Sequence, residues 1–159
     1  MSATRFETRF QTPEDTSRFA VSLGQMLRPG DVILLEGGIG AGKTHFARAL
    51  IQSLMPEPED VPSPTFTLVQ VYEGPGCEIW HADLYRLTDP NEAIELGLDE
   101  AFETAICMIE WPDRLADLTP QGALTLTFEA QEDDSRLLTA TGLGWATRLE
   151  GLSCLQEAT

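Results

Sequence analysis

The hydrophobic pattern along the chain changes between two periods. Short runs of continuous or alternating apolar residues predict strands, and apolar residues spaced three or four positions apart predict helices. The strands predicted in this way cover residues 4–10, 31–36, 65–72, 77–82, 105–109, 124–128 and 136–140. The predicted helices cover residues 12–28, 43–54, 89–96, 98–103 and 143–155. Strands and helices therefore alternate over most of the chain.

The order of these elements predicts an α/β fold. Strands that alternate with helices favour a three-layer domain with a mainly parallel sheet. The continuous apolar run over residues 31–36 is typical of a buried parallel strand. A Gly-Pro-Gly turn separates residues 65–72 from 77–82, so these two strands are expected to form a hairpin. The first strand is expected at an edge of the sheet, and the last two are expected to be antiparallel and to extend one edge.

Composition narrows the class of protein. The chain has 159 residues, 42% of them hydrophobic, and shows no internal repeat or linker, so we expect one domain over residues 1–159. No apolar run approaches the roughly 20 residues of a membrane-spanning helix, and the N-terminus lacks a secretory pattern. A cytoplasmic protein without a membrane partner is therefore expected. The three cysteines include no Cys-x-x-Cys pair, which argues against zinc and redox motifs.

Charge gives two further indications. The formal net charge of −16 repels phosphate backbones, so any contact with RNA is expected to be indirect, through a partner. The ten basic residues are nine arginines and one lysine, Lys43. A single compact ammonium, retained inside a glycine-rich segment, suits a phosphate site.

That segment, residues 37–44, has the pattern G-x-x-x-x-G-K-[ST] of a phosphate-binding loop, or P-loop. Glycines allow unusual backbone dihedrals, and successive N–H groups at a helix N-terminus bind anions. Lys43 is expected to reach the β- and γ-phosphates, and the Thr44 hydroxyl is expected to bind Mg²⁺. The alternative, an ordinary glycine-rich turn, is disfavoured by the buried strand before the loop and the helix after it. His45 either contacts phosphate or is a solvated residue of the first turn.

Two acidic residues end predicted strands, where a P-loop site needs a carboxylate for Mg²⁺. Glu110 follows the strand at 105–109, and Asp83 follows the strand at 77–82. Either or both are candidates, since an acid in this position is often only a solvated loop residue. Thr65, in a proline-flanked segment, is either a switch residue near the γ-phosphate or part of a rigid turn. His81 is interpreted as a structural histidine.

Four segments together resemble the TsaE (YjeE) family, the small bacterial ATPases of tRNA threonylcarbamoyladenosine synthesis. They are L-E-G-G-I-G-A-G-K-T at 35–44, S-P-T-F at 63–66, H-A-D-L-Y-R at 81–86 and I-E-W-P at 109–112. The resemblance covers roughly residues 12–136. It implies a P-loop NTPase fold, ATP or ADP with Mg²⁺ as ligands, and weak intrinsic ATPase activity. It also implies TsaD and TsaB as partners, whose complex modifies adenosine 37 of tRNA and is reset by ATP.

The resemblance also implies roles for individual residues. Thr44 and Glu110 would hold Mg²⁺, Asp83 would lie near the γ-phosphate and orient water, and Thr65 would belong to a switch. Three further residues would approach the base or ribose: Thr12, Ser135 and Arg136. The phosphate-binding positions would be Gly38, Ile39, Gly40, Ala41, Gly42, Lys43, Thr44 and His45.

Two positions depart from the family pattern, and two other function classes are weighed beside it. The family usually has an acidic residue at Gly38 and a hydroxyl residue at His45; neither change removes a phosphate or metal ligand. A small-molecule kinase is disfavoured because no two arginines after Arg9 lie within eight residues of each other, as a phosphate-clamping lid would need. A nucleotide-sensing module without hydrolysis is the second alternative. The absence of an N-K-x-D guanine motif favours ATP over GTP.

Overall fold

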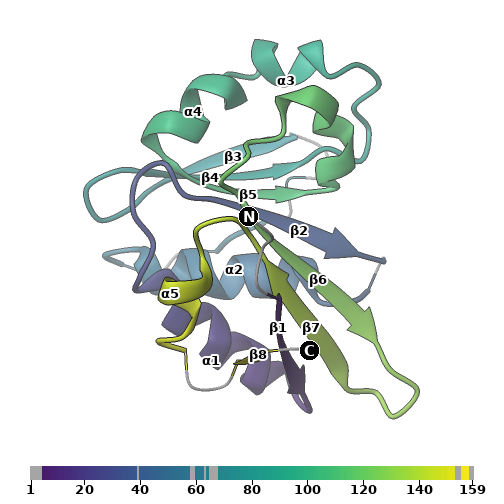
Figure 1. Ribbon diagram of the computed structural model, residues 1–159. Coiled ribbons are helices and arrows are strands. Elements are labelled where there is room, and N and C mark those ends of the chain that lie inside the picture. The colour runs from purple at the N-terminus through teal and green to yellow at the C-terminus, as the bar shows by residue number, and fades with distance from the viewer. Residues whose placement is uncertain are drawn as a thin grey trace.

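The computed structural model of the protein describes residues 5–38, 40–57, 60–62, 64, 68–152 and 155–157 (Figure 1). Over this part of the chain, one mixed sheet of eight strands has the order β3-β4-β5-β2-β6-β7-β1-β8. The strands are β1 Arg5–Phe10, β2 Val32–Gly37, β3 Val69–Glu73, β4 Glu78–Asp83, β5 Ile106–Glu110, β6 Leu124–Ala130, β7 Arg136–Thr141 and β8 Gln156–Glu157.

The centre of the sheet is parallel and its edges are antiparallel. Strands β4, β5, β2 and β6 run parallel to one another, whereas β3 pairs antiparallel with β4, and β7 with β6. All five residues of β5 and the first four of β2 are buried, as expected for strands covered on both faces. The predicted fold class and the hairpin of β3 and β4 are thus confirmed. The expected pairing of β7 with β6 is antiparallel, but β6 itself runs parallel to β2, and β1 and β8 lie beyond β7 at that edge of the sheet.

Helices cover both faces of this sheet, which gives three layers (Figure 1). Helices α1 Pro13–Gly24 and α2 Lys43–Leu54 pack on one face together with the short α5 Ala146–Leu149. Helices α3 Asn91–Glu95 and α4 Leu98–Thr104 and the 3₁₀ helix η1 Pro112–Leu118 cover the other face. A chain of ring contacts links the first face to the sheet, from Phe10 through Phe19 and Phe46 to Phe128, with centroids 5.5–5.9 Å apart.

Helix α1 begins where the sequence predicts. The Thr12 hydroxyl accepts a hydrogen bond from the Asp15 N–H, the Asp15 carboxylate accepts one from the Thr12 N–H, and Pro13 occupies the first helical position. This reciprocal arrangement satisfies two N–H groups that a helix start leaves without intrahelical partners. The helix ends at Gly24, before the predicted break at Pro29.

The predicted helix over residues 143–155 is wrong. Helix α5 has four residues, ends in a turn at Gly151, and the chain then forms β8. Leu149 and Leu152 are buried as the spacing suggested. Contacts with a distant part of the chain hold this segment in place. The Arg148 guanidinium makes two hydrogen bonds, of 2.6 and 3.0 Å, to the carboxylate of Asp31, just before β2.

One strand boundary and the place of one strand in the sheet also differ. Strand β3 begins at Val69, because Leu68 has a left-handed φ of 66° and its N–H donates to the Pro64 carbonyl (2.7 Å). Residues 65–67 of the predicted strand lie outside the described residues. Strand β1 is not the outermost strand, since β8 pairs with its free edge. No helix in the described part of the chain is both long and apolar enough to span a bilayer.

Candidate nucleotide-binding site

The glycine-rich loop joins the carboxyl end of β2 to the start of α2. Gly37 has φ of 141°, and a Cβ added there would lie 2.5 Å from the Phe128 carbonyl oxygen, so no side chain fits. Gly42 precedes α2 with φ of 108°, and the Ala41 N–H donates to the Gly38 carbonyl (3.1 Å). The loop therefore folds back over the end of the sheet and leads into the N-terminus of α2, the geometry that binds phosphate. Ile39 lies outside the described residues.

Lys43, the first residue of α2, is almost fully buried, with 5% of its surface exposed. Its ammonium lies 4.0 Å from the centre of the Trp111 ring, a cation–π contact. Burial lowers the pKa of the Lys43 ammonium, and nearby carboxylates partly offset the effect. These carboxylates belong to Glu110, Asp83 and Asp113.

The two candidate acids lie side by side, because β4 and β5 are neighbouring parallel strands in which Asp83 and Glu110 are register partners. The Thr44 hydroxyl donates to Glu110 Oε1 (2.9 Å), and His81 Nε2 lies 2.7 Å from Glu110 Oε2. Asp83 Oδ1 accepts from the Tyr85 N–H (3.0 Å). The structure therefore brings together both carboxylates and the P-loop threonine.

Two adjoining cavities meet at the P-loop and share Gly42 and His45. The first, of about 560 Å³, is lined by Gly40, Gly42, Lys43, Thr44, His45, Asp83, Tyr85, Glu110 and Trp111. The second, of about 310 Å³, is lined by Phe10, Gln11, Thr12, Pro13, Thr16, Gly42, His45, Asp134 and Arg136. A chain of cavities of this size suits a nucleotide, with phosphates in the first and a nucleoside in the second.

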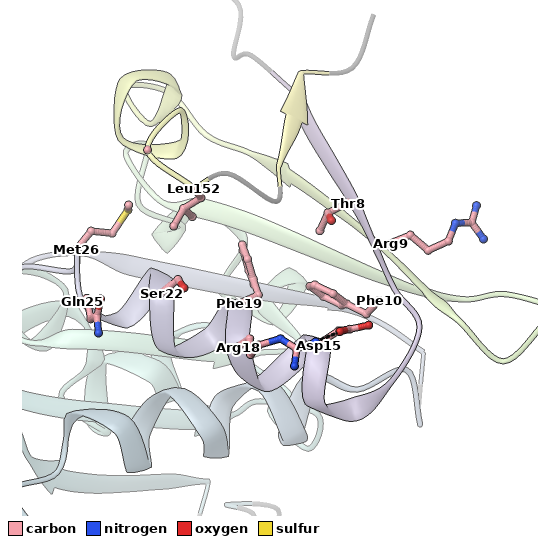
Figure 2. A pocket seen from close by; sticks show the side chains of 11 residues that line it. Thr8, Arg9, Phe10, Asp15, Arg18, Phe19, Ser22, Gln25, Met26 and Leu152 are labelled. Atoms are coloured by element: carbon pink, nitrogen blue, oxygen red, sulfur yellow. Dashed lines mark hydrogen bonds and ion pairs between the residues drawn. The ribbon is translucent and has the colours of Figure 1, made fainter.

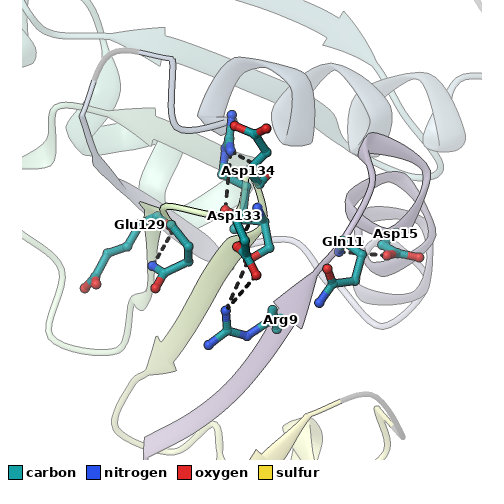
Figure 3. A network of polar contacts seen from close by, with 9 residues as sticks. Arg9, Gln11, Asp15, Glu129, Asp133 and Asp134 are labelled. Carbon is teal, nitrogen blue, oxygen red and sulfur yellow. Dashed lines mark hydrogen bonds and ion pairs between the residues drawn. The ribbon is translucent and has the colours of Figure 1, made fainter.

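The residues expected near the base divide into two groups. Thr12 and Arg136 line the second cavity, and Arg136 Nη2 donates to the Gly40 carbonyl (3.3 Å). Ser135 is not among the lining residues: it is buried in the turn between β6 and β7, where it bonds to Asp133 and accepts from Arg9 (3.1 Å). Figure 3 shows this polar network, with Arg9 reaching from β1 toward Asp133.

His45 contacts α1. Its Nε2 lies 3.1 Å from the Pro13 carbonyl and 3.0 Å from the Ser17 hydroxyl. The ring therefore links the first turns of α1 and α2 at the boundary between the two cavities. His45 is half-buried in the first turn of α2. A phosphate contact of its ring stays a prediction.

The donor set fits Mg²⁺. Thr44, Glu110 and Asp83 offer hydroxyl and carboxylate oxygens, the ligands that this ion prefers. Within the described residues, no group of three or more His, Cys, Asp or Glu side chains forms a metal cage by itself. Mg²⁺ is usually bound by one or two protein groups together with phosphate oxygens.

Sequence reasoning missed two aromatic residues of the first cavity. The Trp111 and Tyr85 rings lie 4.9 Å apart between centroids, and Trp111 has a left-handed φ of 58° where the chain turns from β5 into η1. Both residues belong to segments that carry the family resemblance, Tyr85 to H-A-D-L-Y-R and Trp111 to I-E-W-P, but the resemblance was not used to assign them a role. Thr65 lies outside the described residues, and its role stays a prediction.

A third cavity, of about 670 Å³, lies between α1, β1 and the C-terminal segment (Figure 2). None of the P-loop residues lines it. Its two arginines are already engaged, Arg18 with Asp15 and Arg9 with Ser135 and Asp133. Size alone therefore does not identify it as the nucleotide site.

The fold has three layers, and at its centre a strand leads through a glycine-rich loop into a helix. Carboxylates lie at the ends of neighbouring parallel strands. These features define the P-loop NTPase fold. The family model described as threonylcarbamoyl adenosine biosynthesis protein TsaE matches residues 10–138. The chain belongs to the TsaE family, as the resemblance of its four segments implies.

Individual relatives are similar to this chain in sequence or structure over most of its length. The tRNA threonylcarbamoyladenosine biosynthesis protein TsaE of Rickettsia bellii is 38% identical over 135 residues, which are 85% of this chain and 94% of the relative. The protein of the same name from Bacillus subtilis is 36% identical, over 86% of this chain and 85% of the relative. The crystal structure of Bacillus subtilis YdiB superimposes with a TM-score of 0.78 at 30% identity, covering 96% of this chain and 94% of YdiB.

Proposed function

We propose that this chain is a Mg²⁺-dependent ATPase subunit required for the threonylcarbamoylation of adenosine 37 in tRNA. It acts in the cytoplasm as a single P-loop ATPase domain of residues 1–159, through a complex of TsaD and TsaB homologues. The observation that carries the ATPase proposal is the contact between Thr44 and Glu110 beside the buried Lys43. The tRNA part rests on the relatives, which are named for tRNA threonylcarbamoyladenosine biosynthesis.

In this proposal, the side chains of the first cavity have separate roles in ATP hydrolysis. Thr44 and Glu110 would hold Mg²⁺ together with phosphate oxygens, and the bound ion would neutralise phosphate charge. The Lys43 ammonium would leave the Trp111 ring for the β- and γ-phosphates, where it stabilises charge on the transferring group. Asp83, beside Glu110 on the next strand, would orient the attacking water in line with the bond that breaks.

The shortage of cations in the first cavity supports a role for a partner protein. Lys43 is the one Lys or Arg among the described residues that line the first cavity. P-loop enzymes without a second cation at the γ-phosphate hydrolyse slowly, and an arginine supplied in trans accelerates them about 10³–10⁵-fold. Arg86, the arginine of the H-A-D-L-Y-R segment, is not among the lining residues. This arrangement supports the proposal of weak intrinsic activity that a protein complex stimulates.

The first experiment measures ATP hydrolysis by the purified chain, alone and with purified TsaD and TsaB. We expect slow hydrolysis alone and strong stimulation by the pair, both lost in Lys43→Ala. Arg5→Ala is a matched control, because it removes an exposed cation of β1 whose partner is Glu7. Tight ATP binding without stimulation would favour a nucleotide-sensing switch, and full tRNA modification by Lys43→Ala would contradict the proposal.

A further inference from the structure

A buried histidine holds the carboxylate of Glu110. His81 is fully buried and Glu110 is 2% exposed, on the neighbouring strands β4 and β5. His81 Nε2 lies 2.7 Å from Oε2 of Glu110, whose other oxygen, Oε1, accepts from the Thr44 hydroxyl. The carboxylate is therefore fixed at both oxygens, one by the P-loop threonine and one by His81.

The geometry shows which ring nitrogen of His81 faces the carboxylate, and it is Nε2. A carboxylate that binds Mg²⁺ is ionised and only accepts hydrogen bonds, so in that role of Glu110 the shared hydrogen belongs to His81 Nε2. His81 Nδ1 is buried with no hydrogen-bond partner among the described residues. Only one side of the ring thus makes a hydrogen bond, and that bond goes to Glu110.

This one-sided arrangement separates two explanations of the residue. A histidine that serves only to fill the core gains nothing from an unsatisfied buried nitrogen, which costs stability. A histidine that orients a ligand needs one donor directed at the ligand's outer oxygen, and such supporting bonds fix the orientation of groups that bind metals. The observed geometry is of the second kind.

We propose that His81 is a positioning residue for Glu110, an inference that rests on the proposed Mg²⁺-dependent function. Its N–H bond to Oε2 stops rotation of the carboxylate at the end of β5. Oε1 is thereby kept beside the Thr44 hydroxyl, so that the two oxygens expected to bind Mg²⁺ are already together before nucleotide enters. His81 acts through Glu110 and does not line the first cavity.

The test measures the affinity for ADP by calorimetry, with excess Mg²⁺ and with a chelator, so that no turnover is needed. The wild-type protein should bind ADP more tightly with Mg²⁺. In His81→Leu, the gain in affinity from Mg²⁺ should fall about 10–100-fold, the usual effect of losing a bond that supports a metal ligand. Affinity without metal should change less than about twofold, since the P-loop is intact.

Two amide variants provide the matched control. The side chain of His81→Gln places an N–H near the position of Nε2 and should recover most of the Mg²⁺ effect. The shorter side chain of His81→Asn does not reach Glu110, so this variant should behave like His81→Leu. His81→Asn replaces His81→Leu in the test if the leucine variant does not fold. Glu110→Gln gives the reference for full loss of the effect.

The outcomes separate this inference from the function on which it rests. If the wild-type affinity does not respond to Mg²⁺, the proposed metal dependence fails, and the role of His81 with it. If the wild type responds and His81→Leu or His81→Asn responds equally, only the positioning role is overturned. Equal loss in His81→Gln and His81→Asn would also overturn it, because ring shape rather than the N–H bond would then matter.

Discussion

At the scale of single residues, the charge of Lys43 is expected to favour phosphate binding, but its burial lowers the stability of the folded protein. The ammonium is nearly buried, and its pKa is lowered chiefly by that burial. A lysine with a lowered pKa weakens folding at any pH where it is charged in both the folded and the unfolded states. The contact with Trp111 offsets part of this cost while no phosphate is present.

Replacing Lys43 by Met should therefore leave the nucleotide-free protein at least as stable as the wild type. The variant keeps an unbranched side chain and removes the cost of burying charge. This advantage should be present near pH 7 and should fade as the pH rises through the lowered pKa of Lys43 toward its ordinary value of 10.5, where the wild-type lysine is also neutral. Thermal unfolding across this pH range measures the effect.

Ligand addition completes that experiment. ATP with Mg²⁺ should raise the melting temperature of the wild type and leave that of Lys43→Met unchanged, because binding to the folded state alone stabilises it. A nucleotide-free variant that melts well below the wild type would mean that Lys43 holds the P-loop together, which contradicts this account of its burial.

At the scale of elements, the P-loop depends on a glycine whose role is steric. Gly37 combines a φ of 141° with a close approach to the Phe128 carbonyl of β6, whereas a Cβ at Gly38 would meet nothing within 4 Å. The two neighbouring glycines thus differ in what they tolerate.

The expected result is that Gly37→Ala lowers the free energy of unfolding by about 1–3 kcal/mol, the cost of a strained backbone position. Gly38→Ala should change it by less than about 0.5 kcal/mol, as for an ordinary exposed site. Urea unfolding of both variants, with ATP binding measured in parallel, checks this pair. Equal losses in the two variants would show that general loop flexibility, and not the contact with Phe128, decides stability.

The elements with strong periodicity were predictable from the sequence. The continuous apolar runs became β2 and β5, and the glycine loop lies between β2 and α2 as its pattern required. Both strand-ending acids reach the site, which the sequence left open, because that depends on β4 pairing directly with β5. The His81–Glu110 bond depends on the same register and could not be read from either strand alone.

The C-terminal segment shows the opposite case. Leu149 and Leu152 have helical spacing, and they are buried, yet only four residues of α5 are helical. Gly144 adopts a φ of 80° before this helix, and the Arg148–Asp31 pair anchors the segment to the loop before β2. Short helices gain little stability from local propensity, so contacts made far along the chain decide where they end.

At the scale of the whole molecule, the net negative charge of this chain disfavours direct binding to tRNA. The net charge is −16, and Lys43, its one lysine, is buried in the P-loop. Non-specific binding to nucleic acids comes almost entirely from basic side chains that neutralise phosphates. Arg9, Arg18 and Arg148 are paired with acids of the same chain, so they offer little free positive charge to an RNA backbone.

We therefore expect no saturable tRNA binding by this chain alone near 150 mM salt, at tRNA concentrations up to about 10⁻⁵ M. Proteins with basic surfaces bind nucleic acids non-specifically with dissociation constants of about 10⁻⁴–10⁻⁶ M, and repulsion from an acidic surface should weaken this further. Fluorescence anisotropy of labelled tRNA measures binding, and adding the TsaD–TsaB complex tests whether tRNA joins only through the partners. Micromolar binding to the isolated chain would place an RNA contact on this protein itself, and substitution of its surface arginines one at a time would then locate that contact.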